Sequence, residues 1–241
     1  IALSPSSVKE TYELTIKAFN LTEKYRQPVI LLLDEIVGHM REKIEIPKRE
    51  EIESIDRKRP EGDKENFNPY EFTEDHVPAM PDYGTGYRYH TTGLFHDKTG
   101  FPRGTSEDAK RLMDRFSAKL EENKDDIILY DEDIRDEDKT VVISYGSTVR
   151  SAISAVNEAR EKGINAGWLK LKTIWPFAGE KIEEIAKNAD KIIVPELNQG
   201  QLIREIERHV KGRAEVRGIN RYDGTLIKPE HVMEELKKEV K

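Results

Sequence analysis

Apolar and polar positions follow a regular rhythm from Lys139 to the end of the chain. Short apolar runs predict strands, and longer segments with apolar residues three and four apart predict amphipathic helices. The predicted strands are KTVVISYG, INAGWLKLK, DKIIVPE and GRAEVRG, and the predicted helices are STVRSAISAVNEAREKG, AGEKIEEIAKNA, QGQLIREIERHV and KPEHVMEELKKEV. This alternation predicts an α/β fold with a parallel sheet and helices on both faces. Function is expected at the carboxyl ends of the strands, which read YGST, LKTIWPF and PELNQGQ.

The first 46 residues predict one helix and one buried strand. Capping residues and a following proline delimit the helix, from about Ser6 to Arg26. Its apolar residues form two stripes, which predicts a helix covered on two sides. One stripe is Val8, Tyr12, Thr15 and Phe19, and the other is Leu14, Ala18, Leu21 and Tyr25. The next run, VILLLD, is typical of a strand buried on both faces. Because the only other strand-like run is the short IAL, we expect the chain to begin inside a domain.

Residues 47–138 are expected to form a charged and irregular connector with one helix. From Arg41 to Glu65, 17 of 25 residues are charged and show no periodicity, which is typical of a solvated arm. The later helix is predicted from about Ser106 to Asn123, with Thr105 or Ser106 as its cap. The predicted domains are therefore 1–46, 47–138 and 139–241.

Charge is concentrated in one place. The net charge is −7, and the stretch from Glu121 to Asp138 alone holds ten acidic and two basic residues. We expect this stretch to be a solvated boundary that flanks a short strand, IILY, and not a cation site, because its charges would repel one another in a compact arrangement. No basic stripe with interleaved aromatic residues is present, which argues against nucleic acid as a partner.

Composition narrows the class of protein further. No apolar run reaches the roughly 18 residues of a membrane span and no leader opens the chain, so we expect a cytoplasmic protein without membrane contact. The absence of cysteine excludes disulfides, thiol catalysis and iron–sulfur clusters ligated by this chain. Only three glutamines stand among many charged residues, a bias that favours a thermophilic source.

Two turns at strand ends are candidates for chemistry. The turn Tyr145-Gly146-Ser147-Thr148 opens a helix and could present backbone amides to an anion. It lacks the glycine pattern of dinucleotide or triphosphate loops, so a plain capped turn is favoured. The second turn carries Asn198, Gln199, Gly200 and Gln201, a concentration of amide groups that is either a capping loop or an interface or ligand contact. In IWPF, core packing of Trp175 and Phe177 is favoured over partner docking.

The stretch YHTTGLFHDKTGFP has three possible interpretations: a metal or catalytic site, a packed connector, and a family signature. His90 and His96 do not share a helical face, and no third ligand has a diagnostic spacing, so a metal site is disfavoured. No serine elbow or paired carboxylates point to hydrolysis. The residues by themselves therefore predict no catalytic, cofactor-binding or metal-binding residue in this chain.

Five ordered blocks resemble the alpha subunit of 2-oxoacid:ferredoxin oxidoreductases, of the 2-oxoglutarate type (2-oxoglutarate synthase). The blocks are SPSSVKETYELTIKAFNLTEKYRQPVILLLDEIVGHMRE, HTTGLFHDKTGFP, VVISYGSTVRSA, LKLKTIWPF and PELNQGQL. By this resemblance, the second block is a connector signature, and His90, Thr92 and His96 join Asn198 to Gln201 as candidate interface or ligand contacts. Residues 1–46 resemble only the end of a pyrimidine-binding domain for thiamine diphosphate, and residues from Lys139 resemble a transketolase C-terminal domain.

The resemblance implies an enzyme that converts a 2-oxoacid and coenzyme A into an acyl-CoA and CO₂ and passes electrons to ferredoxin. It implies thiamine diphosphate, Mg²⁺ and Fe–S clusters in the whole enzyme. The partners would be a thiamine-diphosphate-binding beta subunit and smaller gamma and delta (ferredoxin-type) subunits. The family's YPITPS-type motif and substrate-contacting arginine have no match here, so this chain alone is expected to bind no cofactor and to be inactive.

Two other functions compete with this one. A non-enzymatic assembly module could use the same transketolase C-terminal fold, and a preceding pyrimidine-binding domain would discriminate against it. A free nucleotide-binding α/β domain would need a glycine-rich phosphate loop, which is absent. The 2-oxoacid itself is not fixed by the residues present.

Overall fold

The computed structural model describes residues 1–238, which divide into two compact units. The first unit contains residues 1–15, 30–45 and those from 128 onward, and the second contains residues 16–29 and 46–127. The division falls inside helix α1 (Val8–Tyr25), so this helix contributes residues to both units. Within residues 1–238, each helix is too short or too polar to span a bilayer.

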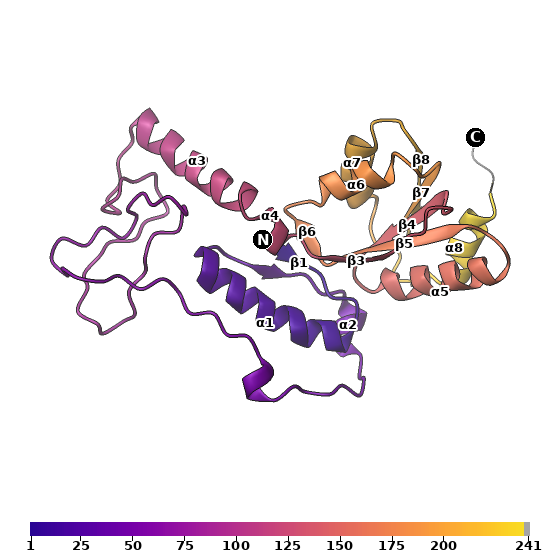
Figure 1. Ribbon diagram of the computed structural model, residues 1–241, viewed down its shortest axis with the longest axis horizontal. Coiled ribbons are helices and arrows are strands. Elements are labelled where there is room, and N and C mark those ends of the chain that lie inside the picture. Colours follow the sequence, from indigo (N-terminus) through magenta and orange to yellow (C-terminus); the bar gives the residue numbers. More distant parts are fainter. Residues whose placement is uncertain (239–241) are drawn as a thin grey trace. The chain divides into compact units, whose positions relative to one another are not determined.

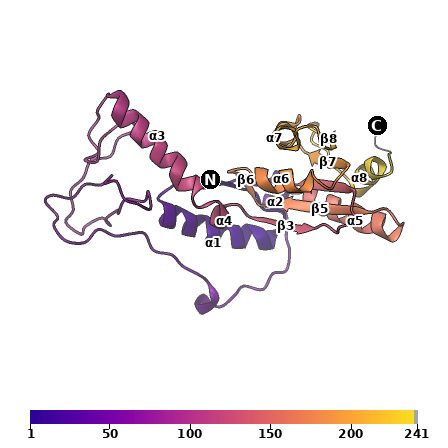
Figure 2. The same ribbon diagram turned by 45° about the horizontal axis from the view of Figure 1, so that its top comes forward.

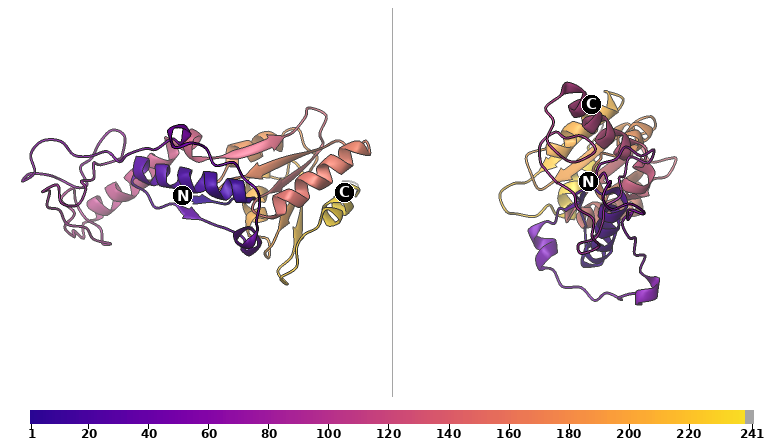
Figure 3. Two further views of the ribbon diagram at one scale, coloured as in Figure 1. Left: turned by 90° about the horizontal axis from the view of Figure 1, so that it is seen from below. Right: turned by 90° about the vertical axis from the view of Figure 1, so that its left-hand side faces the viewer.

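The predicted α/β fold with a parallel sheet is confirmed in the first unit. Its main sheet has the order β3-β5-β4-β7-β8. Four strands run parallel, namely β4 (Thr140–Ser144), β5 (Ala166–Leu171), β7 (Lys191–Glu196) and β8 (Glu215–Asn220). Their helices are α5 (Thr148–Glu161), α6 (Gly179–Ile185), α7 (Gln201–Val210) and α8 (Pro229–Leu236). Helices α5 and α8 cover one face of the sheet and α6 and α7 the other (Figure 1), and α5 lies beside α8 in Figure 3.

The core of this sheet follows from strand alternation, because successive side chains point to opposite faces. Val141 and Ile143 of β4 pack in the cluster that holds the buried residues of α6 and α7. Val142, between them, packs in the cluster of α5 and α8. All three are at most 1% exposed. The unbroken apolar run of β4 therefore corresponds to a strand covered on both faces.

Strand β3 (Tyr130–Asp133) corrects the prediction of a strand at IILY. Ile127 ends the short helix α4 (Lys124–Ile127), and the strand begins at Tyr130 and pairs antiparallel with β5. The sequence of β3 is polar because it lies at an edge of the sheet. Its register places Asp131 opposite Lys170 of β5.

The acidic stretch is also less solvated than predicted. Asp138 is 3% exposed and accepts a hydrogen bond from Arg160 at 3.0 Å. Asp131 of β3 forms ion pairs with Lys170 and Lys172 at 2.5 and 2.7 Å. The expected self-repulsion is relieved because these carboxylates alternate with basic residues brought from elsewhere in the unit.

A small second sheet has the order β2-β1-β6, with β1 (Ala2–Leu3), β2 (Ile30–Leu31) and β6 (Thr173–Trp175). The prediction that VILLLD is buried on both faces is wrong for this structure, because Ile30 and Leu32 are 58% and 45% exposed. Strand β2 has only two residues and lies at the sheet edge. Trp175 is 54% exposed, which corrects its predicted core packing, whereas Phe177 packs against the core.

Helix α1 is confirmed, but only one of its two stripes is buried. Leu14, Leu21 and Tyr25 are buried, whereas Phe19 of the other stripe is 70% exposed. Two-sided apolar patterning therefore overestimates how much of this helix the described residues cover.

The second unit is mostly irregular. Figures 1 and 2 show residues 52–105 as long loops that lead into helix α3 (Ser106–Glu121). The helix and its cap are confirmed, since the Thr105 hydroxyl accepts a hydrogen bond from the backbone N of Asp108 at 3.2 Å. The other elements between residues 30 and 60 are α2 (Glu35–His39), which belongs to the first unit, and the 3₁₀ turn η1 (Arg49–Glu51).

Side chains of α1 hold these loops. The Asn20 amide donates to the carbonyl of Glu53 at 2.9 Å and accepts from the backbone N of Ile55 at 3.0 Å, as a neighbouring strand would. Arg57 forms a two-pronged contact with Glu23, at 2.6 and 2.7 Å. Specific polar contacts with α1 therefore help to order the connector.

Candidate functional site

The carboxyl ends of β4 and β7 lie side by side because the two strands are parallel neighbours. Each is followed by a loop that opens a helix, α5 after β4 and α7 after β7. Polar side chains of both loops meet there, together with one from the loop after β2. Those residues are Asp34, Tyr145, Ser147, Glu196 and Asn198.

The first turn of α5 is occupied by the chain's own carboxylate. Asp34 Oδ2 accepts hydrogen bonds from the backbone N of Ser147 at 2.7 Å and from its hydroxyl at 2.6 Å. Gly146 has a φ of 59°, and a Cβ at that position would lie 2.6 Å from Asp34 Oδ2. The turn YGST therefore does bind an anion, as its amides allow, but the anion is Asp34.

The first turn of α7 is capped in the same way. Glu196 is 0% exposed and accepts from the backbone N of Leu202 at 2.9 Å and of Ile203 at 3.0 Å. A buried carboxylate at a helix N-terminus is stabilised both by these donors and by the helix dipole. Neither N-terminus at this edge is open to a second anion, so the residues here do not fit the diphosphate of thiamine diphosphate.

Tyr145 lies between the two loops. Its hydroxyl accepts a hydrogen bond from the Asn198 amide at 2.7 Å. Burial, together with the negative charges of Glu196 and Asp34, raises the pKa of Tyr145 to about 12. The phenol therefore stays protonated at neutral pH and serves as a fixed link between the loops, not as a base.

The loop from Asn198 to Gln201 has two kinds of residue. Asn198 Oδ1 accepts from the backbone N of Gly200 at 2.7 Å and of Gln201 at 3.1 Å, and Gly200 has a φ of 86°. These two residues shape the loop, which agrees with its interpretation as a capping loop. Gln199 and Gln201 are exposed, and their side chains make no hydrogen bond within residues 1–238.

The stretch YHTTGLFHDKTGFP is a folded turn in the second unit. His96 is 7% exposed, its ring centroid lies 4.1 Å from that of Tyr70, and its Nδ1 donates to the carbonyl of Asp97 at 2.9 Å. The ring of His90 stacks on Phe101 with centroids 4.7 Å apart. At Gly100, with a φ of 84°, a Cβ would lie 2.2 Å from the carbonyl O of His90, so the close chain approach requires glycine.

The candidate residues of this stretch do not converge on a common point. Thr92 accepts from the backbone N of Leu94 at 3.1 Å, and His90 and His96 face different aromatic rings. Across residues 1–238, no three His, Asp or Glu side chains are arranged to hold a metal ion. The geometry favours the packed-connector interpretation. These residues belong to the second unit, whereas Asn198 to Gln201 belong to the first.

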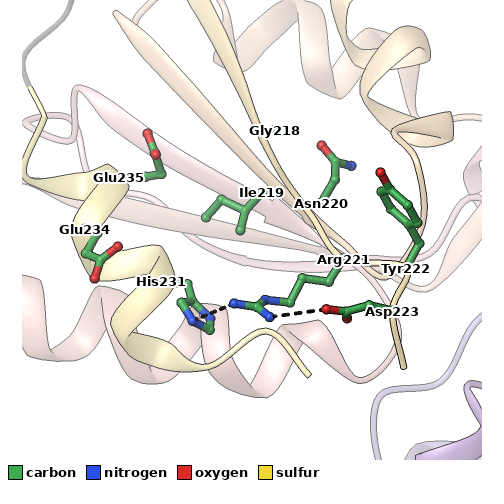
Figure 4. A pocket seen from close by; sticks show the side chains of 9 residues that line it. All are labelled: Gly218, Ile219, Asn220, Arg221, Tyr222, Asp223, His231, Glu234 and Glu235. Carbon is green, nitrogen blue, oxygen red and sulfur yellow. Dashed lines mark hydrogen bonds and ion pairs between the residues drawn. The ribbon is translucent and has the colours of Figure 1, made fainter. Parts of the chain in front are cut away.

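A cavity of about 480 Å³ lies between the end of β8 and helix α8 (Figure 4). Arg221 crosses its floor, with Nη2 3.0 Å from His231 Nε2 and Nη1 3.9 Å from Asp223. The other ring nitrogen of His231 accepts from the backbone N of Lys228 at 3.0 Å. These contacts join the end of strand β8 to helix α8.

Sequence reasoning missed Asp34 and Glu196, and it named Tyr145 only for the backbone of its turn and not for its side chain. Each follows or ends an apolar strand-like run, namely VILLL, VVIS and IIVP. The signal for Asp34 and Glu196 is an acidic residue at the end of a strand. Such a residue can accept hydrogen bonds from the first turn of a helix that begins elsewhere in the chain. The sequence does not show which helix each acid reaches.

Two family models match the chain. Residues 1–115 match the thiamine-diphosphate-binding domain of pyruvate flavodoxin/ferredoxin oxidoreductases, and residues 139–232 match core domain II of pyruvate:ferredoxin oxidoreductase. Among curated relatives, the 2-oxoglutarate synthase subunit KorA of Methanothermobacter thermautotrophicus is 43% identical over 234 residues, 97% of this chain and 62% of the relative. The ketoisovalerate oxidoreductase subunit VorB of the same organism is 32% identical over 244 residues, 98% of this chain and 59% of the relative.

A solved structure agrees with these matches. The 2-oxoglutarate:ferredoxin oxidoreductase of Magnetococcus marinus, with 2-oxoglutarate, coenzyme A and succinyl-CoA bound, superposes with a TM-score of 0.87 at 26% identity. The superposition covers 100% of this chain and 42% of the Magnetococcus marinus chain. The chain thus spans less than two thirds of the proteins that it matches. The resemblance seen in the five sequence blocks is confirmed, and the chain belongs to the 2-oxoacid:ferredoxin oxidoreductase family, among its alpha subunits.

Proposed function

We propose that the chain is part of the alpha subunit of a 2-oxoglutarate:ferredoxin oxidoreductase that forms succinyl-CoA and CO₂ and reduces ferredoxin. The observation that carries the proposal is the 43% identity to 2-oxoglutarate synthase subunit KorA over 97% of the chain. The ligands named for the Magnetococcus marinus enzyme, 2-oxoglutarate and coenzyme A, support the same substrate class. The lower identity of 32% to a ketoisovalerate oxidoreductase subunit favours 2-oxoglutarate over a branched 2-oxoacid.

The complex would be a cytoplasmic hetero-oligomer. We propose thiamine diphosphate as its cofactor, on a site completed by a beta subunit, with Mg²⁺ and Fe–S clusters in the complex and gamma and delta subunits as further members. Because these 241 residues contain no cysteine, any cluster would be ligated by residues outside them. Dense ion pairing and few glutamines support a thermophilic source. The division into residues 1–46, 47–138 and 139–241 is kept as a proposal, and the start of the second family match at residue 139 supports its last boundary.

Coexpression tests the activity. The full-length subunit is purified with its partner chains, and CoA-dependent ferredoxin reduction is measured with 2-oxoglutarate, pyruvate and 2-oxoisovalerate in parallel. We expect the highest kcat/KM with 2-oxoglutarate. An assembled complex that prefers another 2-oxoacid would contradict the substrate, and an assembled complex that is inactive with all three would contradict the enzymatic role and favour the assembly module.

The loop after β7 is proposed as a subunit contact. Gln199 and Gln201 supply it, because their amides are exposed and free while Asn198 and Gly200 hold the loop in shape. The double variant Gln199→Ala/Gln201→Ala is expected to leave stability within about ±0.5 kcal/mol and to weaken association by about 1–3 kcal/mol, since buried partner groups lose their hydrogen bonds. Sedimentation of the complex measures this. Unchanged dissociation would reject the contact, and a raised coenzyme A requirement would indicate a ligand role instead.

The connector signature is proposed as a second contact region. His90 is exposed on its stack with Phe101, and Thr92 lies beside it in sequence, whereas the ring of His96 is buried against Tyr70. We expect His90→Ala to weaken assembly without lowering the melting temperature of the isolated chain. His96→Ala is the control, because loss of its buried contacts is expected to lower the melting temperature first. The reverse pattern would contradict the assignment of His90.

A further inference from the structure

Three basic side chains gather in the second unit without a carboxylate. Arg115 and Lys119 of α3 are 6% and 3% exposed, and Arg26 follows the last residue of α1. Lys119 donates to the backbone O of Arg26 at 3.4 Å, and Arg115 donates to the backbone O of Tyr70 at 3.3 Å. Within residues 1–238, none of the three forms an ion pair. Buried cations are usually paired with a carboxylate. Among the described residues, this cluster has no such counter-charge.

Aromatic rings and carbonyl groups partly replace that counter-charge. The guanidinium of Arg26 lies 4.7 Å from the ring centroid of Tyr70, and its Nη1 donates to the backbone O of Pro69, Pro78 and Ala79. Its Nε and Nη2 make no hydrogen bond within the described chain. Burial lowers the pKa of Arg26, which indicates that its charge is not fully compensated. Two of the three nitrogens of the planar fork are therefore available to a bidentate anion.

The backbone at Arg26 is strained. Its φ is 45°, in the left-handed region that glycine usually supplies at the end of a helix. A non-glycine residue there costs on the order of 1 kcal/mol, and such strain is concentrated at functional sites. The Arg26 side chain reaches into the loops of the second unit, where its Nη1 meets three backbone carbonyls.

A cavity of about 290 Å³ adjoins Arg26. Its walls include the apolar side chains of Pro28, Val77, Pro78 and Met80. The two other cations on its wall already have partners, because Arg57 pairs with Glu23 at 2.6 Å and Lys58 pairs with Asp75 at 2.8 Å. The cavity therefore combines one cation that lacks a counter-charge with an apolar wall, and its volume lies at the lower end of small-molecule sites.

We propose that this cavity binds a small carboxylate with a short aliphatic body, whose carboxylate pairs with the Nε and Nη2 of Arg26. The aliphatic body packs on Val77, Pro78 and Met80. A single negative charge matches Arg26, the one cation among the lining residues of the cavity that has no ion-pair partner, whereas phosphate carries more charge and no apolar group. The site lies within one unit and does not depend on the proposed enzymatic activity.

Calorimetric titration and thermal melting of the full chain test the proposal at fixed ionic strength. The probes are butyrate and its neutral analogues butyramide and 1-butanol, with inorganic phosphate and thiamine diphosphate as further arms. We expect butyrate alone to bind with one-to-one stoichiometry and to raise the melting temperature by about 2–4 °C near saturation. Equal effects of the neutral analogues would reject the role of charge. Preferential binding of phosphate or thiamine diphosphate would reject the ligand class.

Matched variants locate the site. Arg26→Gln is expected to weaken butyrate binding about tenfold or more, because a charge-assisted pair is lost. Lys58→Gln removes the same charge from the same cavity but leaves Arg26, so it is expected to change affinity by less than about threefold. If Arg26→Gln does not fold, Met80→Trp fills the cavity with Arg26 in place and Met80→Leu serves as its control. Retained binding in Arg26→Gln or in Met80→Trp would overturn the proposal.

Discussion

The carboxylate of Asp34 and the backbone N of Ser147 lie 2.7 Å apart, although 113 residues separate them in the chain. This contact joins the loop after β2 to the first turn of α5. It also gives that turn an anion that the sequence around Ser147 does not contain. The N-terminus of α5 is therefore completed by a residue from the first 46 positions.

Loss of this carboxylate is expected to destabilise the first unit. Asp34→Ala removes both the acceptor for Ser147 and the favourable charge at the helix N-terminus, and we expect a loss of about 1–2 kcal/mol in the free energy of unfolding. Urea denaturation measures it. Glu35→Ala is the control, because that side chain is 90% exposed. Equal losses in the two variants would show that the cap contributes nothing specific.

The contact between α6 and α7 is expected to tolerate no side chain at Gly179. A Cβ there would lie 2.2 Å from the ring of His209. We expect Gly179→Ala to cost about 1–3 kcal/mol through overpacking, and Gly179→Ala/His209→Ala to recover part of it. Gly38→Ala, where no atom lies within 4 Å of the added Cβ, is the control. Thermal denaturation of the wild type, of Gly179→Ala, of His209→Ala and of the double variant checks the cycle, and additive losses would rule out the clash.

A buried ion pair is expected to make the first unit sensitive to acid. Lys170 pairs with Glu10, and the two side chains are 12% and 11% exposed. Burial opposes ionisation of Glu10, but hydrogen bonds from Lys170 and Ser6 outweigh it and lower its pKa. The stabilisation is therefore complete above pH 4.5 and is lost as pH falls through the lowered folded-state value.

The variant Glu10→Gln measures how much the ionised Glu10 contributes to stability. We expect it to lose about 1–3 kcal/mol at pH 7, because Lys170 keeps Asp131 as a second partner. The difference between wild type and variant should shrink as pH falls below 4.5. Denaturant titrations from pH 3 to pH 7 measure it, and a difference that does not vary with pH would contradict the assignment.

Lys119 is expected to destabilise the second unit at neutral pH. Burial and the neighbouring charges of Arg115 and Arg26 lower the pKa of Lys119 to about 8. Since this is below the unfolded value of 10.5, the unfolded state binds more protons between pH 8 and pH 10.5, and the contribution of Lys119 to stability rises across that window.

Replacement of Lys119 by methionine tests whether Lys119 destabilises the second unit at neutral pH. Lys119→Met should be as stable as the wild type or more stable at pH 7, and its advantage should disappear as pH approaches 10.5. Lys110→Met is the control, because the Lys110 side chain is 77% exposed. Melting temperatures from pH 7 to pH 10 give the comparison. A variant that is less stable than wild type at pH 7 would mean that the carbonyl contact of Lys119 outweighs its desolvation.

The parallel sheet was predictable because its strands are covered on both faces, and such burial produces unbroken apolar runs such as Val141 to Ile143. The same rule failed at Ile30, where an equally apolar run lies at the edge of a small sheet. It also missed β3, since Asp131 and Asp133 belong to a strand only because basic residues face them. The local sequence pattern indicates which structure a segment prefers. Whether a strand is buried and whether its charges are paired depends on distant parts of the chain.

The candidate site divides in the same way. Asn198 and Gly200 could be assigned to a loop from turn chemistry alone. Tyr145 and Glu196 could not be brought together before the strand order was known, because their proximity follows from β4 and β7 being neighbours. Asp34 reaches them from the loop after β2, 113 residues before Ser147. The basic cluster around Arg26 was equally hidden, since Arg26 and Lys119 are 93 residues apart in the chain.

Lys191 begins the interior strand β7 and is 2% exposed. Its ammonium donates to the carbonyls of Glu235, Leu236 and Lys238, at and just beyond the end of α8. Fraying of the last turn of α8 would remove the acceptors of a buried charge inside the sheet. Terminal helices usually exchange their amide protons through independent local opening. Here the last turn of α8 should open only together with β7, so its amides are expected to exchange as slowly as those of β7.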